Sequence, residues 1–470
     1  MENLFTGKQI HIIGMARSGQ AAAEALLALG AIVTMHDQKD ESKLFANPGE
    51  AGLVGDWAKS AGVSIKCGNR AYEGITNADT VVVSPGVPEG CEGLVIARKT
   101  GIPILPEIEL AYRMSNAPIL AITGTNGKTT TTALVGQMLR SAGKNTFIAG
   151  NIVAGDIRLA LTTAALRSRP DDVIVAEISS FQLETISSFK PKVAALLNVT
   201  CDHMDRYTGI EPYAKAKGRI FEYQDKSDFA VVNANDPVTM DIAAGVHGEV
   251  WTFGRELVEG RGTFARGTEV WMQQDAHRSF VCDTAEMKLR GAHNLENVMA
   301  ASAMVIAFGA PVECITNALK VFNPPEHRME PVAELNGIEF LNNSMCTNVD
   351  AAVKSLEAVG RPCIVIAGGK DKGSDFTDLG TAFKRCAKHA VLIGADAGLI
   401  ERSALAAGFH EISFAESLED AVSRAWKQAV SGDTIMLSPG CASFDMFKDF
   451  EDRGRVFKSV VKDLVDREGA

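Results

Sequence analysis

The stretch AITGTNGKTT, residues 121–130, decides the fold class of this chain. An apolar run, PILAI (residues 118–122), comes before its glycines, and TTTTALVGQMLRSAG (residues 129–143) follows them with a helical pattern. The usual phosphate-binding loop, Gly-x-x-x-x-Gly-Lys-[Ser/Thr], would place a glycine at position 122, where this chain has Ile122. The loop here is the shorter Gly-x-x-Gly-Lys-Thr. It is either a nucleotide site of a particular kind or a plain glycine turn.

The residue types in this short loop favour the nucleotide site. Gly124 and Gly127 allow the backbone to approach phosphate oxygens. Lys128 can reach the β- and γ-phosphates of a nucleotide, and the Thr129 hydroxyl can bind Mg²⁺. A turn that needed only flexibility would require neither the lysine nor the hydroxyl. The sequence therefore predicts a phosphate-binding loop between a strand and a helix.

Strand and helix patterns alternate on both sides of this loop and predict an α/β protein with parallel sheets. In the first region, a glycine turn from Gly14 to Gly19 follows the strand QIHII and mimics a dinucleotide fingerprint, although such a turn can also bind nothing. In the central region, residues 248–282 predict a small β appendage, and a helix is expected from about Asn294 to Gly309. A third region begins after NPPEHR (residues 323–328), where two prolines interrupt any helix.

Composition narrows the class of protein. A chain of 470 residues is too long for one compact core, which predicts several domains. The net charge of −11 argues against nucleic acid as the main partner, and no apolar run approaches the ~18 residues of a membrane span. The N-terminus leads almost directly into KQIHIIG, which leaves no room for a signal peptide. Nine cysteines without metal-ligand spacing indicate free thiols, so we expect a cytoplasmic protein. We also expect a monomer.

A series of motifs resembles the Mur ligases, in order and spacing, from about residue 8 to about residue 460. The motifs are TGTNGKT (123–129), AEISSFQLE (176–184), LNVTCDHMDRY (197–207), YAKAKGRI (213–220), GAHNLENVMAA (291–301), HR (327–328), AGGKDKGSDF (367–376) and SPGCASFDMFKDFEDRG (438–454). Three of these motifs, SSFQLE, DHMDRY and CASFDMFKDF, are specific to one kind of ligase within the superfamily. They imply the activity that adds D-glutamate to UDP-N-acetylmuramoyl-L-alanine, with ATP, in peptidoglycan precursor synthesis.

The resemblance implies three domains and a two-step reaction. A Rossmann-like domain (1–108) would bind the UDP substrate, a central P-loop ATPase-type parallel sheet (109–325) would bind ATP, and a C-terminal Rossmann-like domain (326–470) would bind the amino acid and part of ATP. The substrate carboxylate would take the γ-phosphoryl group of ATP, and the amine of the amino acid would then displace phosphate from the acyl phosphate.

Family matching also assigns the residues. The catalytic set would be Lys128, Glu177, His203 and Lys217. Two Mg²⁺ sites would use Thr129 with Glu177, and Glu177 with His203 and a carbamylated Lys217, which is preferred to Lys215 because it follows Tyr213 by four residues. ATP would contact Gly124, Thr125, Asn126, Gly127, Lys128, Thr129, Thr130, Asn294, Asn297, Arg328 and Asn343. The muramyl substrate and the amino acid would contact Arg17, Ser18, Asp37, Gln38, Lys39, Gly86, Asn151, Ser179, Gln182, Thr347, Lys372, Ser443 and Phe450.

One stretch departs from the family pattern, and two alternatives stay open. Where Mur ligases have Asn-Asp-Ser-Lys-Ala-Thr-Asn, this chain has NNSMCTN (342–348), so Asn343 replaces an aspartate and Met345 a lysine.

One alternative function is that of a related ligase that adds L-glutamate or another amino acid to the same substrate. The other is a degenerate protein that binds a UDP-sugar without chemistry, against which the intact Lys128 and Lys217 argue. A dehydrogenase would leave the central region unexplained.

Overall fold

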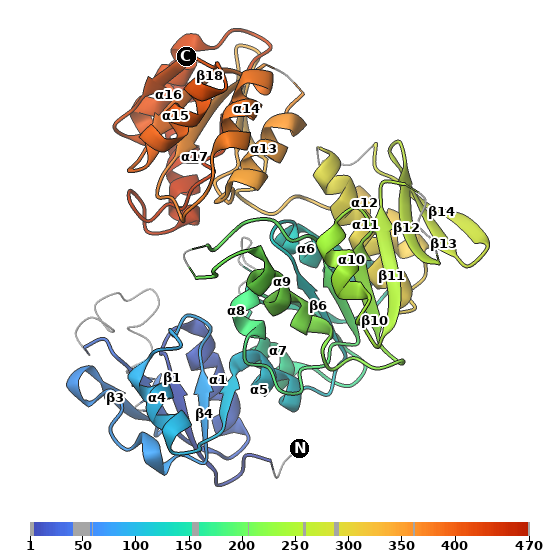
Figure 1. Ribbon diagram of the computed structural model, residues 1–470, viewed down its shortest axis with the longest axis vertical. Helices are drawn as coiled ribbons and strands as arrows, with labels where there is room; N and C mark the ends of the chain where they lie inside the picture. The colour runs from blue at the N-terminus through green and yellow to red at the C-terminus, as the bar shows by residue number, and fades with distance from the viewer. Residues whose placement is uncertain are drawn as a thin grey trace.

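The strands of this chain form three sheets that follow one another along the sequence. The structure is a computed structural model that describes residues 4–40, 57–58, 60–152, 159–204, 206–256, 260–285, 291–360 and 362–468. Among these residues the sheets have five, nine and six strands, and Figure 1 shows the three regions in blue, green to yellow, and orange to red. The alternating α/β pattern that the sequence predicts is therefore confirmed.

The first sheet is entirely parallel, in the order β3-β2-β1-β4-β5. The chain order reverses between β1 and β4, and ligands of open α/β sheets bind at such a point, beyond the carboxyl ends of the strands. The turn from Gly14 to Gly19 and Ser84 lie there. The elements are β1 (Gln9–Ile13), α1 (Arg17–Ala28), β2 (Ile32–Asp37), β3 (Ser64–Cys67), β4 (Thr80–Val83), α4 (Glu92–Lys99), β5 (Ile104–Pro106) and α5 (Glu107–Met114), with 3₁₀ turns at Gly68–Arg70 and Ile75–Asn77.

Gly19 lets α1 approach β1 closely enough to form this site. A Cβ atom at position 19 would lie 1.9 Å from the carbonyl oxygen of Gly14, a contact that requires the backbone to move. We expect Gly19→Ala to lower the free energy of unfolding by about 1–3 kcal/mol and to weaken binding of a UDP ligand. Thermal unfolding and titration with UDP would measure both. Gly398→Ala, in the third region, is the matched control, because nothing lies within 4 Å of a Cβ atom there, and equal melting temperatures for the two variants would contradict the prediction.

The central sheet has the order β14-β13-β12-β11-β10-β9-β6-β8-β7, parallel from β7 to β12 and antiparallel beyond. All five residues of β6 are buried, and β6 lies between β8 and β9. The strands are β6 (Ile119–Thr123), β7 (Thr146–Gly150), β8 (Val173–Glu177), β9 (Val193–Leu196), β10 (Phe229–Asn233), β11 (Glu249–Gly254), β12 (Arg261–Arg266), β13 (Glu269–Gln274) and β14 (His277–Asp283).

The expectation of a small β appendage at residues 248–282 is wrong in one respect. Strand β11 pairs with β10 in parallel register, from Phe229 opposite Glu249 to Asn233 opposite Phe253, so this segment extends the central sheet. Helix α11 covers this part of the sheet and begins close to the expected Asn294. The helices of the region are α6 (Lys128–Ser141), α7 (Leu161–Arg167), α8 (Ser180–Leu183), α9 (Ile210–Gly218), α10 (Pro237–Ala243), α11 (Ala292–Ala307) and α12 (Glu313–Val321), with a 3₁₀ turn at Arg219–Phe221.

The third sheet has the order β15-β16-β20-β17-β18-β19, in which only the edge strand β15 is antiparallel to its neighbour. The elements are β15 (Glu330–Leu335), β16 (Ile338–Asn342), α13 (Val349–Ala358), β17 (Cys363–Gly368), α14 (Thr377–Cys386), β18 (Ala387–Ile393), α15 (Ala397–Ala406), β19 (Ile412–Phe414), α16 (Leu418–Gln428), β20 (Thr434–Leu437) and α17 (Phe450–Glu468).

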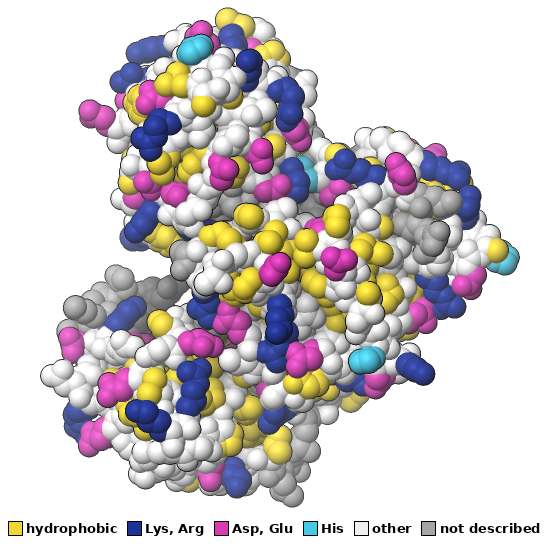
Figure 2. Space-filling view, in the orientation of Figure 1, with side chains coloured by type: hydrophobic (Ala, Val, Ile, Leu, Met, Phe, Trp, Pro, Cys, Tyr) yellow, Lys and Arg dark blue, Asp and Glu magenta, His cyan; other side chains and the backbone are white. Residues whose placement is uncertain are grey.

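The three regions are joined in different ways. One buried apolar cluster runs from the first region into the central one and includes Leu26 of α1 and Leu161 of α7. The third region has apolar clusters of its own, and it contacts the central region through polar pairs such as Asn126 with Asp350 and Asp202 with Lys372, although Figure 2 shows hydrophobic as well as charged side chains at the junction. Polar junctions separate more easily than shared apolar cores. No helix in the described ranges is long and apolar enough to cross a membrane.

Candidate active site

The phosphate loop occupies the gap between the end of β6 and the start of α6. Gly124 and Gly127 have φ angles of 156° and 85°, in the range that favours glycine. A Cβ atom on Gly127 would also lie 2.3 Å from the Asn297 side-chain oxygen. Helix α6 begins without a side-chain cap or an acidic residue in its first turn. Its N-terminus therefore offers backbone N–H groups and a positive dipole end to an anion.

Lys128 is folded back onto its own loop. Its ammonium donates to the carbonyl oxygens of Gly124 at 3.0 Å and Thr125 at 2.9 Å. Burial lowers the pKa of Lys128, the nearby Glu177 and Asp202 oppose this shift, and Arg328 and Lys372 add to it. Cations from the third region thus lie close enough to this lysine to affect its charge.

Glu177 and Thr129 form a pair of adjacent oxygens at the same edge of the sheet. Glu177 is the last residue of β8, is 3% exposed, and its carboxylate accepts a hydrogen bond of 2.8 Å from the Thr129 hydroxyl. A carboxylate and a hydroxyl beside a phosphate loop are the oxygen ligands that Mg²⁺ prefers. These two residues fit the first Mg²⁺ site that the sequence predicts.

His203 and Lys217 meet around Tyr213. The His203 ring has its centroid 6.3 Å from that of Tyr213, and the Lys217 ammonium lies 4.4 Å from the same ring. Lys217 is 1% exposed and donates to the Gly124 carbonyl at 2.8 Å, whereas Lys215 is exposed. Burial, together with the Lys128 ammonium, holds the pKa of Lys217 well below its ordinary value. Lys217 rather than Lys215 therefore reaches the phosphate loop.

The predicted contacts of the UDP substrate separate into two groups. Five of them line a cavity of about 220 Å³ between the first and central regions: Arg17, Ser18, Gly86, Asn151 and Gln182. Gln38 lines a separate cavity of about 670 Å³, and Lys39 is exposed. The Asp37 carboxylate accepts hydrogen bonds from the backbone N–H groups of Met15 and Lys39. Ser179 and Gln182 form a capping box at the start of α8.

The sequence interpretation missed Glu107, which lines the 220 Å³ cavity. Its carboxylate, 2% exposed, accepts hydrogen bonds of 2.9 Å from the backbone N–H and the hydroxyl of Thr162. Burial raises the pKa of Glu107, and the nearby Arg17 opposes the shift. The signal was present in LPEIEL, where a carboxylate stands inside an apolar pattern. Glu107 links the first region to α7 of the central one.

A third cavity, of about 30 Å³, lies between the central and third regions. It is lined by Asn126, Gly127, Leu197, Asn198, Phe253, His293, Glu296, Asn297, Arg328, Ala351, Lys354 and Ser355. Asn297 donates to the side-chain oxygen of Asn294 at 3.0 Å and fixes the pair on α11. The Arg328 Nε is buried and has no hydrogen-bond partner in the described chain. An unpartnered guanidinium nitrogen beside the phosphate loop is suited to an anionic ligand.

Lys372 brings the amino-acid end of the site to the central region. Its ammonium donates to the Asp202 carboxylate at 3.2 Å, beside His203. Burial alone would raise the pKa of Asp202, but Lys372 and His203 hold it below its ordinary value. Ser443 is buried, while Thr347 and Phe450 are partly buried, and Phe450 accepts a hydrogen bond from Ser344 at its backbone oxygen. The predicted amino-acid contacts thus all come from the third region.

Asn343, where the family pattern has an aspartate, is held by neighbours that suit an amide. It is 2% exposed, its NH₂ group donates to the hydroxyl oxygens of Ser355 at 2.8 Å and Ser438 at 3.4 Å, and its oxygen accepts from the Met329 N–H. The Ser355 hydroxyl already donates its proton to the Ala351 carbonyl at 2.7 Å. An aspartate here would face a hydroxyl lone pair instead of a donor.

We therefore expect Asn343→Asp alone to lower the free energy of unfolding by about 1–3 kcal/mol and to raise the KM for ATP. Adding Met345→Lys should reduce that damage, because it returns a positive charge to the same segment. A double-mutant cycle on the KM for ATP measures the coupling. Strictly additive effects of the two substitutions would contradict it.

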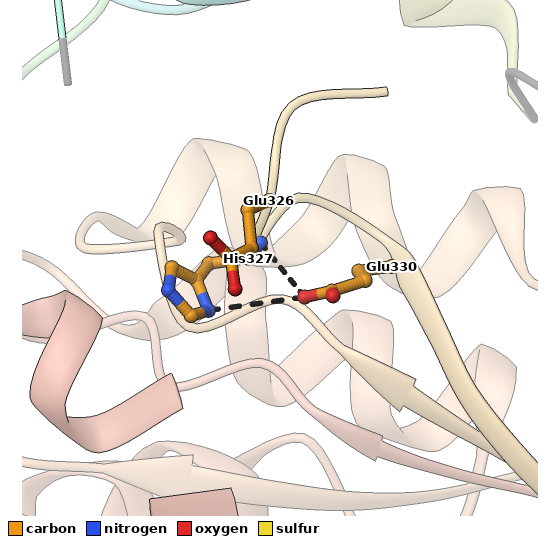
Figure 3. A group of neighbouring side chains, drawn as sticks. All are labelled: Glu326, His327 and Glu330. Carbon is orange, nitrogen blue, oxygen red and sulfur yellow. Dashed lines mark hydrogen bonds and ion pairs between the residues drawn. The ribbon is translucent and has the colours of Figure 1, made fainter. Parts of the chain in front are cut away.

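A cluster next to Arg328 has the geometry of a cation site but is neutralised by a lysine. Glu326, His327 and Glu330 lie together beside β15 (Figure 3). The Lys458 ammonium of α17 donates to both carboxylates, at 3.1 Å to Glu330. Since a lysine already balances these charges, the cluster ties the start of the third region to α17.

Comparisons with known proteins agree with this geometry. Residues 122–305 match the family model described as Mur ligase middle domain, and residues 327–441 match Mur ligase, glutamate ligase domain. A protein of Pelotomaculum thermopropionicum named UDP-N-acetylmuramoylalanine--D-glutamate ligase is 44% identical over 98% of this chain and 98% of its own length. A protein of the same name from Koribacter versatilis is 41% identical over 98% of this chain and 99% of its own length.

Solved structures share the fold at low sequence identity. UDP-N-acetylmuramate-alanine ligase from Thermotoga maritima has a TM-score of 0.59 and 18% identity, covering 97% of this chain and 99% of its own. MurF ligase from Thermotoga maritima, solved in complex with ADP, has a TM-score of 0.58 and 14% identity, covering 98% of this chain and 97% of its own.

Proposed function

The chain belongs to the Mur ligase family, and from this we propose where its substrates bind. It is an ATP-dependent ligase that adds D-glutamate to UDP-N-acetylmuramoyl-L-alanine in peptidoglycan precursor synthesis. The phosphate loop with Arg328 and Asn297 would hold ATP, the cavity at Arg17 would hold the UDP substrate, and the segment around Lys372 would hold D-glutamate. The observation that carries this assignment is the convergence of Lys128 and Lys217 on the Gly124 carbonyl.

The reaction proceeds through an acyl phosphate. The terminal carboxylate of the UDP substrate attacks the γ-phosphorus of ATP, and ADP leaves. The amine of D-glutamate then attacks the acyl carbon, and phosphate leaves as the amide forms. Lys128 and the loop N–H groups stabilise the charge of the transferring phosphoryl group, which is most of what a protein contributes to such a step.

Two Mg²⁺ sites complete the proposal, one at Thr129 and Glu177 and one at Glu177, His203 and Lys217. Bound Mg²⁺ neutralises the charge of the phosphate oxygens. The second site requires Lys217 as a carbamate, since an ammonium cannot be a ligand for a cation and a carbamate provides carboxylate-like oxygens. The full burial of Lys217 and its contact with the phosphate loop support this assignment.

The remaining parts of the proposal concern the whole molecule. We place the domain boundaries at 108/109, which falls in the first turn of α5 (Glu107–Met114), and at 325/326, between α12 and β15. The chain would act as a monomer in the cytoplasm, where its nucleotide substrates occur. Size-exclusion chromatography with light scattering measures the mass in solution, which should be that of one 50.1 kDa chain.

The test of function is ATP-dependent phosphate release with UDP-N-acetylmuramoyl-L-alanine and a panel of amino acids. D-glutamate should support the fastest release, with little from L-glutamate. Equal or faster release with L-glutamate would favour the related ligase instead. Binding of the UDP substrate without release for any amino acid would favour a binding protein without chemistry.

A further inference from the structure

Lys354 of α13 lies in the cavity between the central and third regions, beside residues of the proposed nucleotide site. It lines this cavity together with Gly127 of the phosphate loop, Asn297 of α11 and Arg328. The site assignments above give it no role. Its position places a second cation from the third region, after Arg328, in this cavity.

Asp350 holds the Lys354 ammonium at the phosphate loop. One carboxylate oxygen of Asp350 accepts a hydrogen bond of 2.9 Å from Lys354 and one of 2.5 Å from the side-chain N–H of Asn126. Asn348 adds a hydrogen bond of 3.1 Å to the oxygen of the same Asn126 side chain. The same Asp350 oxygen therefore links the Lys354 ammonium to Asn126 of the phosphate loop.

Of the two cations that line the cavity, Lys354 is paired with Asp350, and the Arg328 Nε has no hydrogen-bond partner among the described residues. Glu296, the acid that lines it, is paired with Arg255 at 2.8 Å. Burial, with Arg328 and Lys354 nearby, lowers the pKa of His293 to about 4, so this histidine is neutral at pH 7. Arg328 and Lys354 are thus the positive groups that the third region directs into the cavity.

The departure at position 345 changes the charge on this flank of the site relative to the family pattern. Met345 stands where the family pattern has a lysine, and its N–H donates to the His327 carbonyl, next to Arg328. The chain has therefore lost one positive charge on this flank of the site. Lys354, one helical turn into α13, provides a positive charge on the same domain.

We propose that Lys354 is a nucleotide-binding residue of this chain that contacts the phosphates of ATP from the C-terminal domain, and that Asp350 is its positioning residue. The proposal rests on the assignment of ATP to this site. A charge-assisted hydrogen bond from an ammonium to a phosphate strengthens binding by about tenfold or more. This hydrogen bond strengthens the binding of ATP and ADP, which carry phosphates, and not the binding of adenosine.

Titration calorimetry with ATP, ADP and adenosine tests the proposal on full-length Lys354→Ala, Lys354→Arg and the wild type. We expect Lys354→Ala to bind ATP and ADP about tenfold more weakly and adenosine within about twofold of the wild type. Lys354→Arg should retain most of the affinity for ATP. Lys427→Ala, at an exposed position on α16 of the same domain, is the control and should bind like the wild type.

Steady-state kinetics separate binding from a general structural effect. The KM for ATP should rise by about tenfold in Lys354→Ala, whereas kcat at saturating ATP and the KM for D-glutamate should change by less than about twofold. ATP affinity of Lys354→Ala equal to that of the wild type would overturn the proposal, as would an equal loss of adenosine affinity. If the wild type binds ATP but releases no phosphate with any amino acid, the proposed function fails while the calorimetric comparison still decides the role of Lys354.

Discussion

Lys128→Ala should lose ATP-dependent phosphate release by about a thousandfold or more, while it stays folded. The ammonium of Lys128 lies at the phosphate loop, where it donates to the carbonyl oxygens of Gly124 and Thr125. When ATP binds, a rotation of the Lys128 side chain can bring the same ammonium to the phosphates. The negative charge of the transferring phosphoryl group has to be stabilised there, in a site largely shielded from water, where electrostatic interactions are strong.

The measurement is initial rates of phosphate release at saturating ATP, UDP-N-acetylmuramoyl-L-alanine and D-glutamate. Lys144→Ala is the matched control, since Lys144 is exposed just beyond the other end of α6 and should retain full activity. Thermal unfolding of both variants checks the fold. Near-normal turnover by a folded Lys128→Ala protein would contradict the assignment of ATP to the phosphate loop.

Local sequence was enough to predict the elements that carry this site. The strand before the loop, the loop glycines and the following helix all lie where AITGTNGKTT predicts them, because an apolar run, positive-φ glycines and a helical pattern adjoin each other. Glu177 lies at the end of a buried strand, as DVIVAEIS predicts. The order of the motifs was also enough to identify the family.

Contacts between distant segments could not be predicted in the same way. The hydrogen bond between Asn126 and Asp350 joins residues 224 positions apart, and no periodicity in either segment signals it. The continuation of the central sheet through β12 to β14 was missed because pairing of strands depends on which edges meet, and not on the pattern of each strand alone. Glu107 was missed because an acid in an apolar stretch does not by itself identify its partner, here Thr162.

Lys217→Ala is expected to lose at least about a hundredfold in activity, whereas Lys215→Ala should stay within about twofold of the wild type. The two lysines lie two positions apart on α9, but Lys217 is buried against Tyr213 and the Gly124 carbonyl and Lys215 is exposed. Burial lowers the pKa of Lys217, which favours the neutral amine relative to the ammonium. This form attacks carbon dioxide, a C–N bond forms, and one proton leaves to give the carbamate anion.

Direct detection of the carbamate on Lys217 is a sharper test than the loss of activity. Protein incubated with ¹³C-bicarbonate, Mg²⁺ and nucleotide should show one carbamate resonance that is absent in Lys217→Ala and retained in Lys215→Ala. The resonance should weaken when Mg²⁺ is removed, because two nearby cations favour the anion and their loss favours the free amine. A fully active wild-type enzyme without that resonance would show that Lys217 acts without carbamylation, and the second metal site would then need a different oxygen ligand. Loss of the resonance in Lys215→Ala would instead place the carbamate on the exposed lysine, against the burial that distinguishes the two.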